Sequence, residues 1–140
     1  MMNNRLKAIR WGMTGALLAG AGVALGAFGA HTLADVLSVE RLETYGTGIS
    51  YLQYHALAIL VVAWLAGRQD LAEASVRLLF RAAQAFALGI LFFTGSLVTL
   101  SVTGITWLGA VAPVGGVAFM TGWVLTAVGI SRSRLLRTEA

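Results

Sequence analysis

Long stretches of this 140-residue chain carry no charged side chain, and the charges are gathered between them. Residues 11–34 and 44–67 are charge-free stretches of 24 residues each, and residues 82–131 are one of 50. A helix that crosses a bilayer needs about 20 mostly apolar residues, because about 30 Å of hydrocarbon is crossed at about 1.5 Å per residue. The two shorter stretches therefore predict one spanning helix each, and the longest predicts two spans joined by a turn.

The composition supports a membrane protein. Hydrophobic residues make up 58% of the chain and charged residues 11%, whereas soluble domains average about 45–50% and about 25%. We therefore expect an all-α integral membrane four-helix bundle, formed by a single transmembrane domain over residues 1–140. The expected elements are helices at about 8–33, 44–67, 82–100 and 108–131, a turn within 101–107, and a helical connection over 68–81 at the membrane surface.

The cationic side chains predict how the chain is oriented. Nine of the ten lie in the N-terminal tail, the 68–81 connection or the C-terminal tail, and only Arg41 lies in a loop on the other side. Cationic loops stay on the cytoplasmic side, so both termini are expected in the cytoplasm. The net charge of +4 has the same origin and does not indicate nucleic-acid binding. The first apolar run is longer than a usual signal-peptide core, so we expect it to be retained as a spanning helix.

Small residues recur in the first helix at a spacing of four. In lipid, side chains of this kind let helix backbones approach closely, which is the main packing device there. We therefore expect this helix at the centre of the bundle, and Gly95 as a packing position in the third helix. The expected packing residues of the first helix are Gly15, Ala19, Gly22, Gly26, Gly29 and Ala30.

The second helix has a clear start signal outside the membrane. Ser38 followed by Glu40 and Glu43 is typical of an N-cap with acidic residues in the first turns. Further along, Tyr51 and His55 are four residues apart, so they lie on one face of the helix. That face is polar within an apolar span.

His31 and His55 are the histidines of the charge-free stretches, and ionisable groups inside a membrane are functional candidates. His55 lies about 18 Å along a regular helix from Glu43, which places the two histidines at different depths. That separation argues against haem ligated by both imidazoles. With no carboxylate or thiol beside them, no metal site is expected either. Two interpretations of His55 stay open: a neutral imidazole bonded to another helix, or part of an outward-facing cleft that binds a lipid head group or small molecule.

Hydrolytic machinery is not evident in the sequence. There is no Gly-x-Ser-x-Gly elbow, no His-Glu-x-x-His motif, no phosphate-binding loop and no cysteine. Ser96 beside Gly95 is interpreted as a small residue that permits close packing. We therefore expect no catalytic residue, no cofactor and no metal.

Several short motifs, taken in order, resemble the YgdD-like family of small bacterial membrane proteins, which has mitochondrial relatives. They are Gly26–His31, Tyr51–Ala58, Phe93–Leu97, Ala112–Gly116 and Gly122-Trp123. Thr94 departs mildly from the family, where serine is more common. The resemblance implies a four-helix protein of the bacterial inner membrane whose biochemical role is open. The candidate ligand-binding residues, from the resemblance and the polar face together, are His31, Tyr51, Tyr54, His55, Thr94, Ser96, Pro113, Gly115 and Gly116.

These observations favour a non-enzymatic accessory or assembly subunit, or a homo-oligomeric bundle. Membrane lipids, a membrane-protein partner or further copies of the chain are its expected partners. The alternative is a binder or transporter of a lipid or small amphipathic ligand in a cleft near the two histidines. A haem protein or an enzyme is the second alternative.

Overall fold

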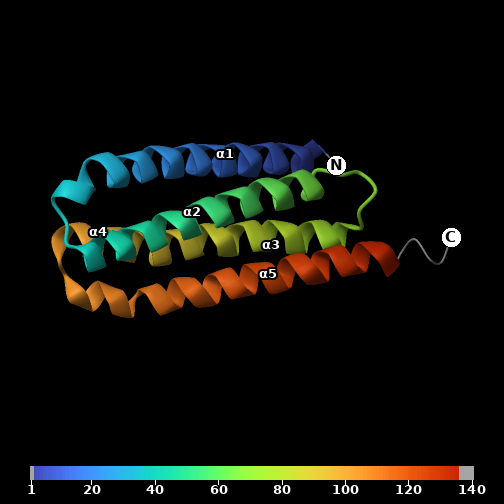
Figure 1. Cartoon of the computed structure of the whole chain (residues 1–140). Coiled ribbons are helices and arrows are strands. Elements are labelled where there is room, and N and C mark those ends of the chain that lie inside the picture. Colours follow the sequence, from blue (N-terminus) through green and yellow to red (C-terminus); the bar gives the residue numbers. More distant parts are fainter. Residues whose placement is uncertain (1, 136–140) are drawn as a thin grey trace.

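A computed structural model describes residues 2–135 of the chain, with side chains from 3 to 132, and all regular structure within them is helical. Figure 1 shows long helices side by side, with the start of α1 and the end of α5 at the same end of the bundle. We call this the terminal end. The elements are α1 (Met2–His31), η1 (Leu33–Asp35), α2 (Val39–Ala66), α3 (Glu73–Gly89), η2 (Ile90–Thr94), α4 (Gly95–Thr103), η3 (Thr106–Ala110) and α5 (Ala112–Leu135).

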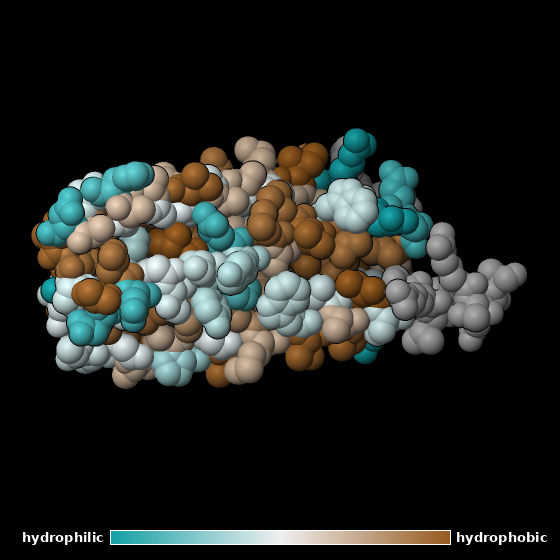
Figure 2. All heavy atoms as spheres, viewed as in Figure 1, coloured by the Kyte–Doolittle hydropathy of each residue, from teal (hydrophilic) through white to brown (hydrophobic). Residues whose placement is uncertain are grey.

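Four helical segments in the described part of the chain are long and apolar enough to cross a membrane. The third consists of α3, the π-helix η2 and α4, which follow one another without a break. In Figure 2, hydrophilic atoms gather near the two ends of the molecule, and much of the middle is hydrophobic. The predicted all-α, four-helix membrane fold is confirmed. Arg137 and Glu139 of the C-terminal charge cluster lie outside the described residues.

The connection between the second and third spans is shorter than expected. The sequence predicts a helix over 68–81 on the membrane surface, but α3 begins at Glu73 and continues through the third span. The correction has a physical reason: Val76 and Leu79 are 4% and 1% exposed, so the apolar face of this segment packs into the bundle. A bidentate contact of Arg68 with Asp70, at 2.9 and 2.7 Å, lies in the turn before it.

At the opposite end, two predicted local features are present. Ser38 caps α2, with its hydroxyl accepting from the Arg41 backbone N–H at 3.4 Å. The turn between the last two spans contains Gly104, whose φ of +76° is readily adopted by glycine at a helix C-terminus. The Arg41 side chain donates from Nε to the Ser101 carbonyl at 2.6 Å, which ties α2 to the end of α4.

Pro113 lies in the first turn of α5, where its missing N–H removes no helical hydrogen bond.

The centre of the bundle is α2, not the first helix. In the most apolar 18-residue stretch of α2, 50% is buried inside the bundle, whereas the corresponding stretch of the first span is 17% buried. α1 packs along α2 and touches α3 only slightly, whereas α2 also contacts α3, η2 and α4 (Figure 1). The expectation that the first helix is central is wrong. Its small residues allow one close contact, with α2, and a close contact on one face does not require other helices to pack on the remaining faces.

Two series of glycines at seven-residue spacing bring helices together in pairs. A Cβ added to Gly15, Gly22 or Gly29 would come within 2.9 Å or less of α2 atoms, so these glycines let α1 lie directly against α2. Gly26 makes ordinary contact, Ala19 is half-buried and Ala30 is exposed. A seven-residue repeat is the period of left-handed helix pairs.

The second series lies in α5 and faces the third span. A Cβ at Gly122 would approach the Phe86 ring to 2.5 Å, and one at Gly115 would overlap the Phe93 backbone. Gly129 faces Leu79 in the same register. By contrast, Gly95 is exposed and a Cβ there would meet nothing within 4 Å, which corrects its expected role in packing.

Candidate functional site

His55 lies inside a cluster of aromatic rings between α2, the third span and α5. Its imidazole is 5% exposed and stacks on Phe119, with ring centroids 3.5 Å apart and an 11° angle between the planes. Tyr51 stacks on two rings, with its centroid 5.8 Å from that of His55 and 4.5 Å from that of Phe93. We call this set the ring cluster; its members are Tyr51, His55, Phe86, Phe93, Phe119 and Trp123.

Both ring nitrogens of His55 have partners. Trp123 donates from Nε1 to His55 Nε2 at 3.3 Å, and His55 Nδ1 lies 2.8 Å from the Tyr51 carbonyl. An indole N–H only donates and a carbonyl only accepts, so the two contacts together require a neutral imidazole with its proton on Nδ1. In this arrangement neither nitrogen is left for a metal or a haem iron. The geometry corresponds to the interhelical bonding interpretation of His55.

A second polar contact lies where the third span widens into the π-helix η2. Thr94, 6% exposed, donates its hydroxyl to the Gly48 carbonyl of α2 at 3.0 Å. A single π turn in a longer helix often marks a specialised position. Here the widened turn carries the hydroxyl that links the third span to α2. Ser96, in the next turn, donates instead to the Phe93 carbonyl of its own helix at 3.0 Å.

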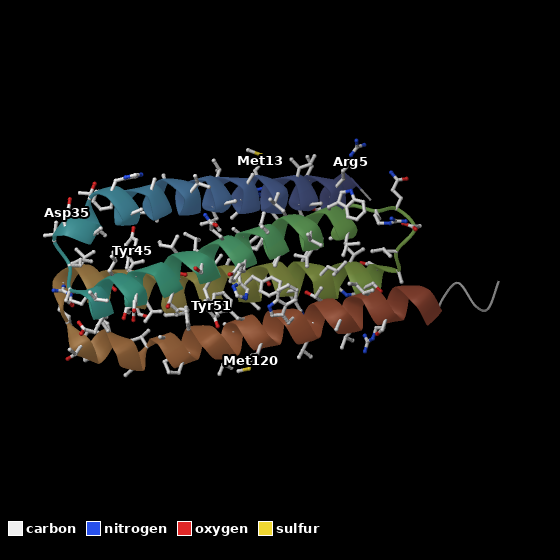
Figure 3. The ribbon with its side chains drawn as sticks, in the orientation of Figure 1. Arg5, Met13, Asp35, Tyr45, Tyr51 and Met120 are labelled. Atoms are coloured by element: carbon white, nitrogen blue, oxygen red, sulfur yellow. The ribbon has the colours of Figure 1, made fainter. Side chains whose placement is uncertain are left out.

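The structure brings some of the candidate residues together and separates others. Tyr51, His55 and Gly115 share the region around the ring cluster, and Thr94 lies beside it on η2. Figure 3 shows Tyr51 on α2 near the middle of the bundle. His31 is not part of this region. It is exposed at the last position of α1, whereas His55 lies about 24 Å along α2 from that helix's start.

Other candidates face outward. Tyr54 is 63% exposed, Pro113 is exposed, and a Cβ at Gly116 would meet nothing within 4 Å. None of the four cavities described in the structure is lined by a predicted ligand-binding residue. Within the described residues there is also no group of three histidine, cysteine or acidic side chains suited to a metal. The four cavities described therefore do not include a cleft around His31 or His55.

The sequence reasoning missed most of the ring cluster. Phe86 and Phe93 are seven residues apart, as are Gly115 and Gly122, and that shared spacing is the signal that pairs them. Phe119 lies midway between the two glycines on α5 and stacks on His55. An aromatic residue at such a position in a membrane span is usually read as lipid-facing, so its partner is evident only once α5 is placed.

Comparison with known proteins identifies the family. Residues 25–116 match the family described as a protein of unknown function (DUF423). The chain belongs to this family. It is 43% identical over 117 residues to the UPF0382 membrane protein YwdK of Bacillus subtilis. The matched residues cover 84% of this chain and 89% of that protein. No solved structure matches it.

A second relative confirms the resemblance to YgdD seen in the motifs. The UPF0382 inner membrane protein YgdD of Escherichia coli is 39% identical over 111 residues, covering 79% of this chain and 80% of that protein. A UPF0382 membrane protein of Haemophilus influenzae is 36% identical over 115 residues, with coverage of 81% and 87%. The family assignment and four apolar helices agree that this is a membrane protein. The relatives' names describe location and give no activity.

Proposed function

We propose that the chain is a non-enzymatic membrane subunit that assembles with further copies of itself through α1. The observation that carries the proposal is a face of α1 that no other helix covers. Ala16, Gly20, Ala24 and Ala27 are all exposed, and we call them the free face. A Cβ added at Gly20 would meet nothing within 4 Å, in contrast to the glycines that face α2.

The residues of the free face suit contact with another helix in lipid. Ala16, Gly20 and Ala24 follow one another at four-residue spacing, the pattern that lets two spanning helices approach at the backbone. Beside them, Leu17 and Val23 are 72% and 64% exposed and provide larger side chains to pack around such a contact. Small residues on a lipid-facing surface have no packing role within this chain.

A second copy is the partner that best fits this face. Copies inserted in the same orientation have parallel α1 helices, and a two-fold axis along the membrane normal brings Gly20 of one copy to Gly20 of the other. Such an interface uses the same patch on both subunits and needs no other protein. The non-enzymatic part of the proposal is supported by the interior polar groups: those of His55 and Thr94 are engaged in helix-to-helix contacts.

The test is the oligomeric state of the purified protein in lipid nanodiscs. We expect a dimer or larger oligomer for the unchanged chain, and dissociation that is at least about tenfold easier in Gly20→Leu, equivalent to about 1.4 kcal/mol. Gly116→Leu is the matched control because Gly116, on α5, also has open space around it. A monomeric wild-type protein, or equal behaviour of the two variants, would refute the proposal.

We also propose that the protein lies in the cytoplasmic membrane of a bacterium with both termini in the cytoplasm. Nine of ten cationic side chains support this orientation. The tenth, Arg41, is engaged with the Ser101 carbonyl at the end of α4, where a cation also interacts favourably with the helix dipole. A reporter that is active only in the cytoplasm should be active when it is fused after residue 140. Activity of a reporter that works only on the other side of the membrane would contradict the orientation.

A further inference from the structure

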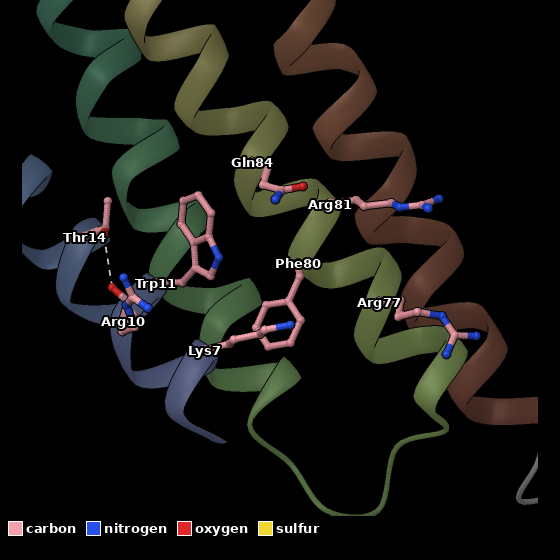
Figure 4. Close-up of a pocket in the computed structure, with 8 residues that line it drawn as sticks. All are labelled: Lys7, Arg10, Trp11, Thr14, Arg77, Phe80, Arg81 and Gln84. Carbon is pink, nitrogen blue, oxygen red and sulfur yellow. Dashed lines mark hydrogen bonds between the residues drawn. The ribbon is translucent and has the colours of Figure 1, made fainter. Parts of the chain in front are cut away.

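A cleft lined by cationic side chains lies between α1 and α3 towards the terminal end of the bundle (Figure 4). Its volume is about 410 Å³, within the range of about 300–1,000 Å³ common for small-molecule sites. The cleft exists because α1 packs on α2 and makes only slight contact with α3. We call it the basic cleft; its lining is Lys7, Arg10, Trp11, Thr14, Arg77, Phe80, Arg81 and Gln84.

From this arrangement we propose that the basic cleft binds an anionic phospholipid. The phosphate would lie among the cations of the two helices, and the upper part of the acyl chains would lie along the rings of Trp11 and Phe80. In Figure 4 these two rings project from α1 and α3 into the space between the helices. The proposal is independent of the assembly of copies through the free face of α1.

The charges of the basic cleft are largely uncompensated. Arg77 forms an ion pair with Glu73 at 3.1 Å, four residues earlier on the exposed side of α3. Lys7, Arg10 and Arg81 form no ion pair within the described part of the chain. Arg68, which is outside the cleft, is different: its hydrogen bonds and charge interaction with Asp70 raise the pKa of the guanidinium. Three unpaired cations around one hollow favour an anionic occupant.

The position of the cations favours a lipid as the source of that anion. Arg10 and Arg81 are each the last charged residue before a charge-free stretch, residues 11–34 and 82–131, within helical segments apolar enough to span a membrane. Cations at the edge of a span reach the head-group layer with their long side chains. Basic pockets between spanning helices are a recurrent kind of site for anionic lipid head groups. A free inorganic anion would make no use of the two aromatic rings.

The test measures lipid binding to the full-length protein by native mass spectrometry. Phosphatidylglycerol, cardiolipin and phosphatidylcholine are titrated separately onto protein stripped of lipid. We expect the two anionic lipids to bind at least about tenfold more tightly than phosphatidylcholine. Equal binding of all three would overturn the proposal, and this comparison needs no variant. Displacement of phosphatidylglycerol by millimolar inorganic phosphate would also overturn it, because the site would then recognise phosphate alone.

A matched pair of double variants locates the site. Arg10→Gln with Arg81→Gln removes one cation from each wall of the basic cleft, and we expect binding of anionic lipid to weaken about 30-fold, from roughly five- to sixfold per cation. Arg5→Gln with Arg132→Gln removes the same charge from residues that do not line the cleft. This control should stay within about twofold of the wild type. An equal loss in both would mean general attraction to the surface and would refute the assigned site.

Discussion

Replacing Gly115 by alanine tests the packing of α5 on the third span. The added Cβ would lie 2.6 Å from Phe93 Cβ and 2.8 Å from its Cα, and would overlap the Phe93 backbone nitrogen. Backbone atoms cannot rotate away, so ordinary separations of about 3.4 Å from all three Phe93 atoms require α5 to move by about 1 Å. Overpacking of this kind costs about 1–3 kcal/mol. The displacement would also loosen the stack of Phe119 on His55.

Gly116→Ala is the matched control, one residue further along the same helix. Its Cβ would meet nothing within 4 Å, and alanine in place of a helical glycine stabilises by about 0.4–1 kcal/mol. Both variants gain this term, so they should differ by the overpacking cost of about 1–3 kcal/mol, or about 3–10 °C in thermal unfolding followed in one detergent by circular dichroism. If Gly115→Ala unfolds within about 2 °C of Gly116→Ala, the close contact of α5 with Phe93 is wrong.

Three further predictions concern polar contacts between helices. Nitrogen NMR of the labelled protein should show His55 as the neutral imidazole protonated on Nδ1, and Trp123→Phe should alter its Nε2 shift; a proton on Nε2 would contradict the bond from Trp123. Thr94→Val should lower the unfolding free energy in detergent by about 0.6–1.7 kcal/mol, whereas Thr121→Val, at an exposed site, should change it by less than about 0.5; similar losses would refute the contact with α2. Arg41→Gln should speed hydrogen exchange at the end of α4 severalfold, and unchanged exchange would count against the 2.6 Å bond.

The number and place of the spanning helices could be predicted from charge alone. Placing a charged side chain in hydrocarbon costs several kcal/mol, so it outweighs local helix propensities and limits each span. The cap at Ser38 was predictable for a different reason, since a hydroxyl before acidic residues satisfies the free N–H groups of a helix start. Both signals are local in the sequence.

The placement of 68–81 was not predictable in the same way. This segment has charges on one face and apolar residues on the other, a pattern equally suited to a membrane surface and to the flank of a bundle. Burial of Leu79 shows that packing on neighbouring helices decided between them. The central position of α2 is likewise a tertiary outcome, because glycines in α1 indicate close approach but not how many helices approach.

The candidate site was predictable only in part. His55 and Tyr51 were singled out by their polarity on one face of a span, and they do lie together. Trp123 supplies the hydrogen bond that sets the His55 tautomer, and it comes from a helix 68 residues further along the chain. His31 is also a histidine in an apolar stretch, but it is exposed. The sequence could not separate the two, because residue type alone does not tell which face of a helix points into the bundle.

The most direct test of the account is disulfide formation between copies in native membranes. The chain has no cysteine, so a single introduced cysteine is its only thiol. Under mild oxidation, Gly20→Cys should give a covalent dimer in high yield. Val124→Cys on α5, which is 62% exposed, should give little. Equal yields from both positions, or no dimer from Gly20→Cys, would contradict assembly through the free face of α1.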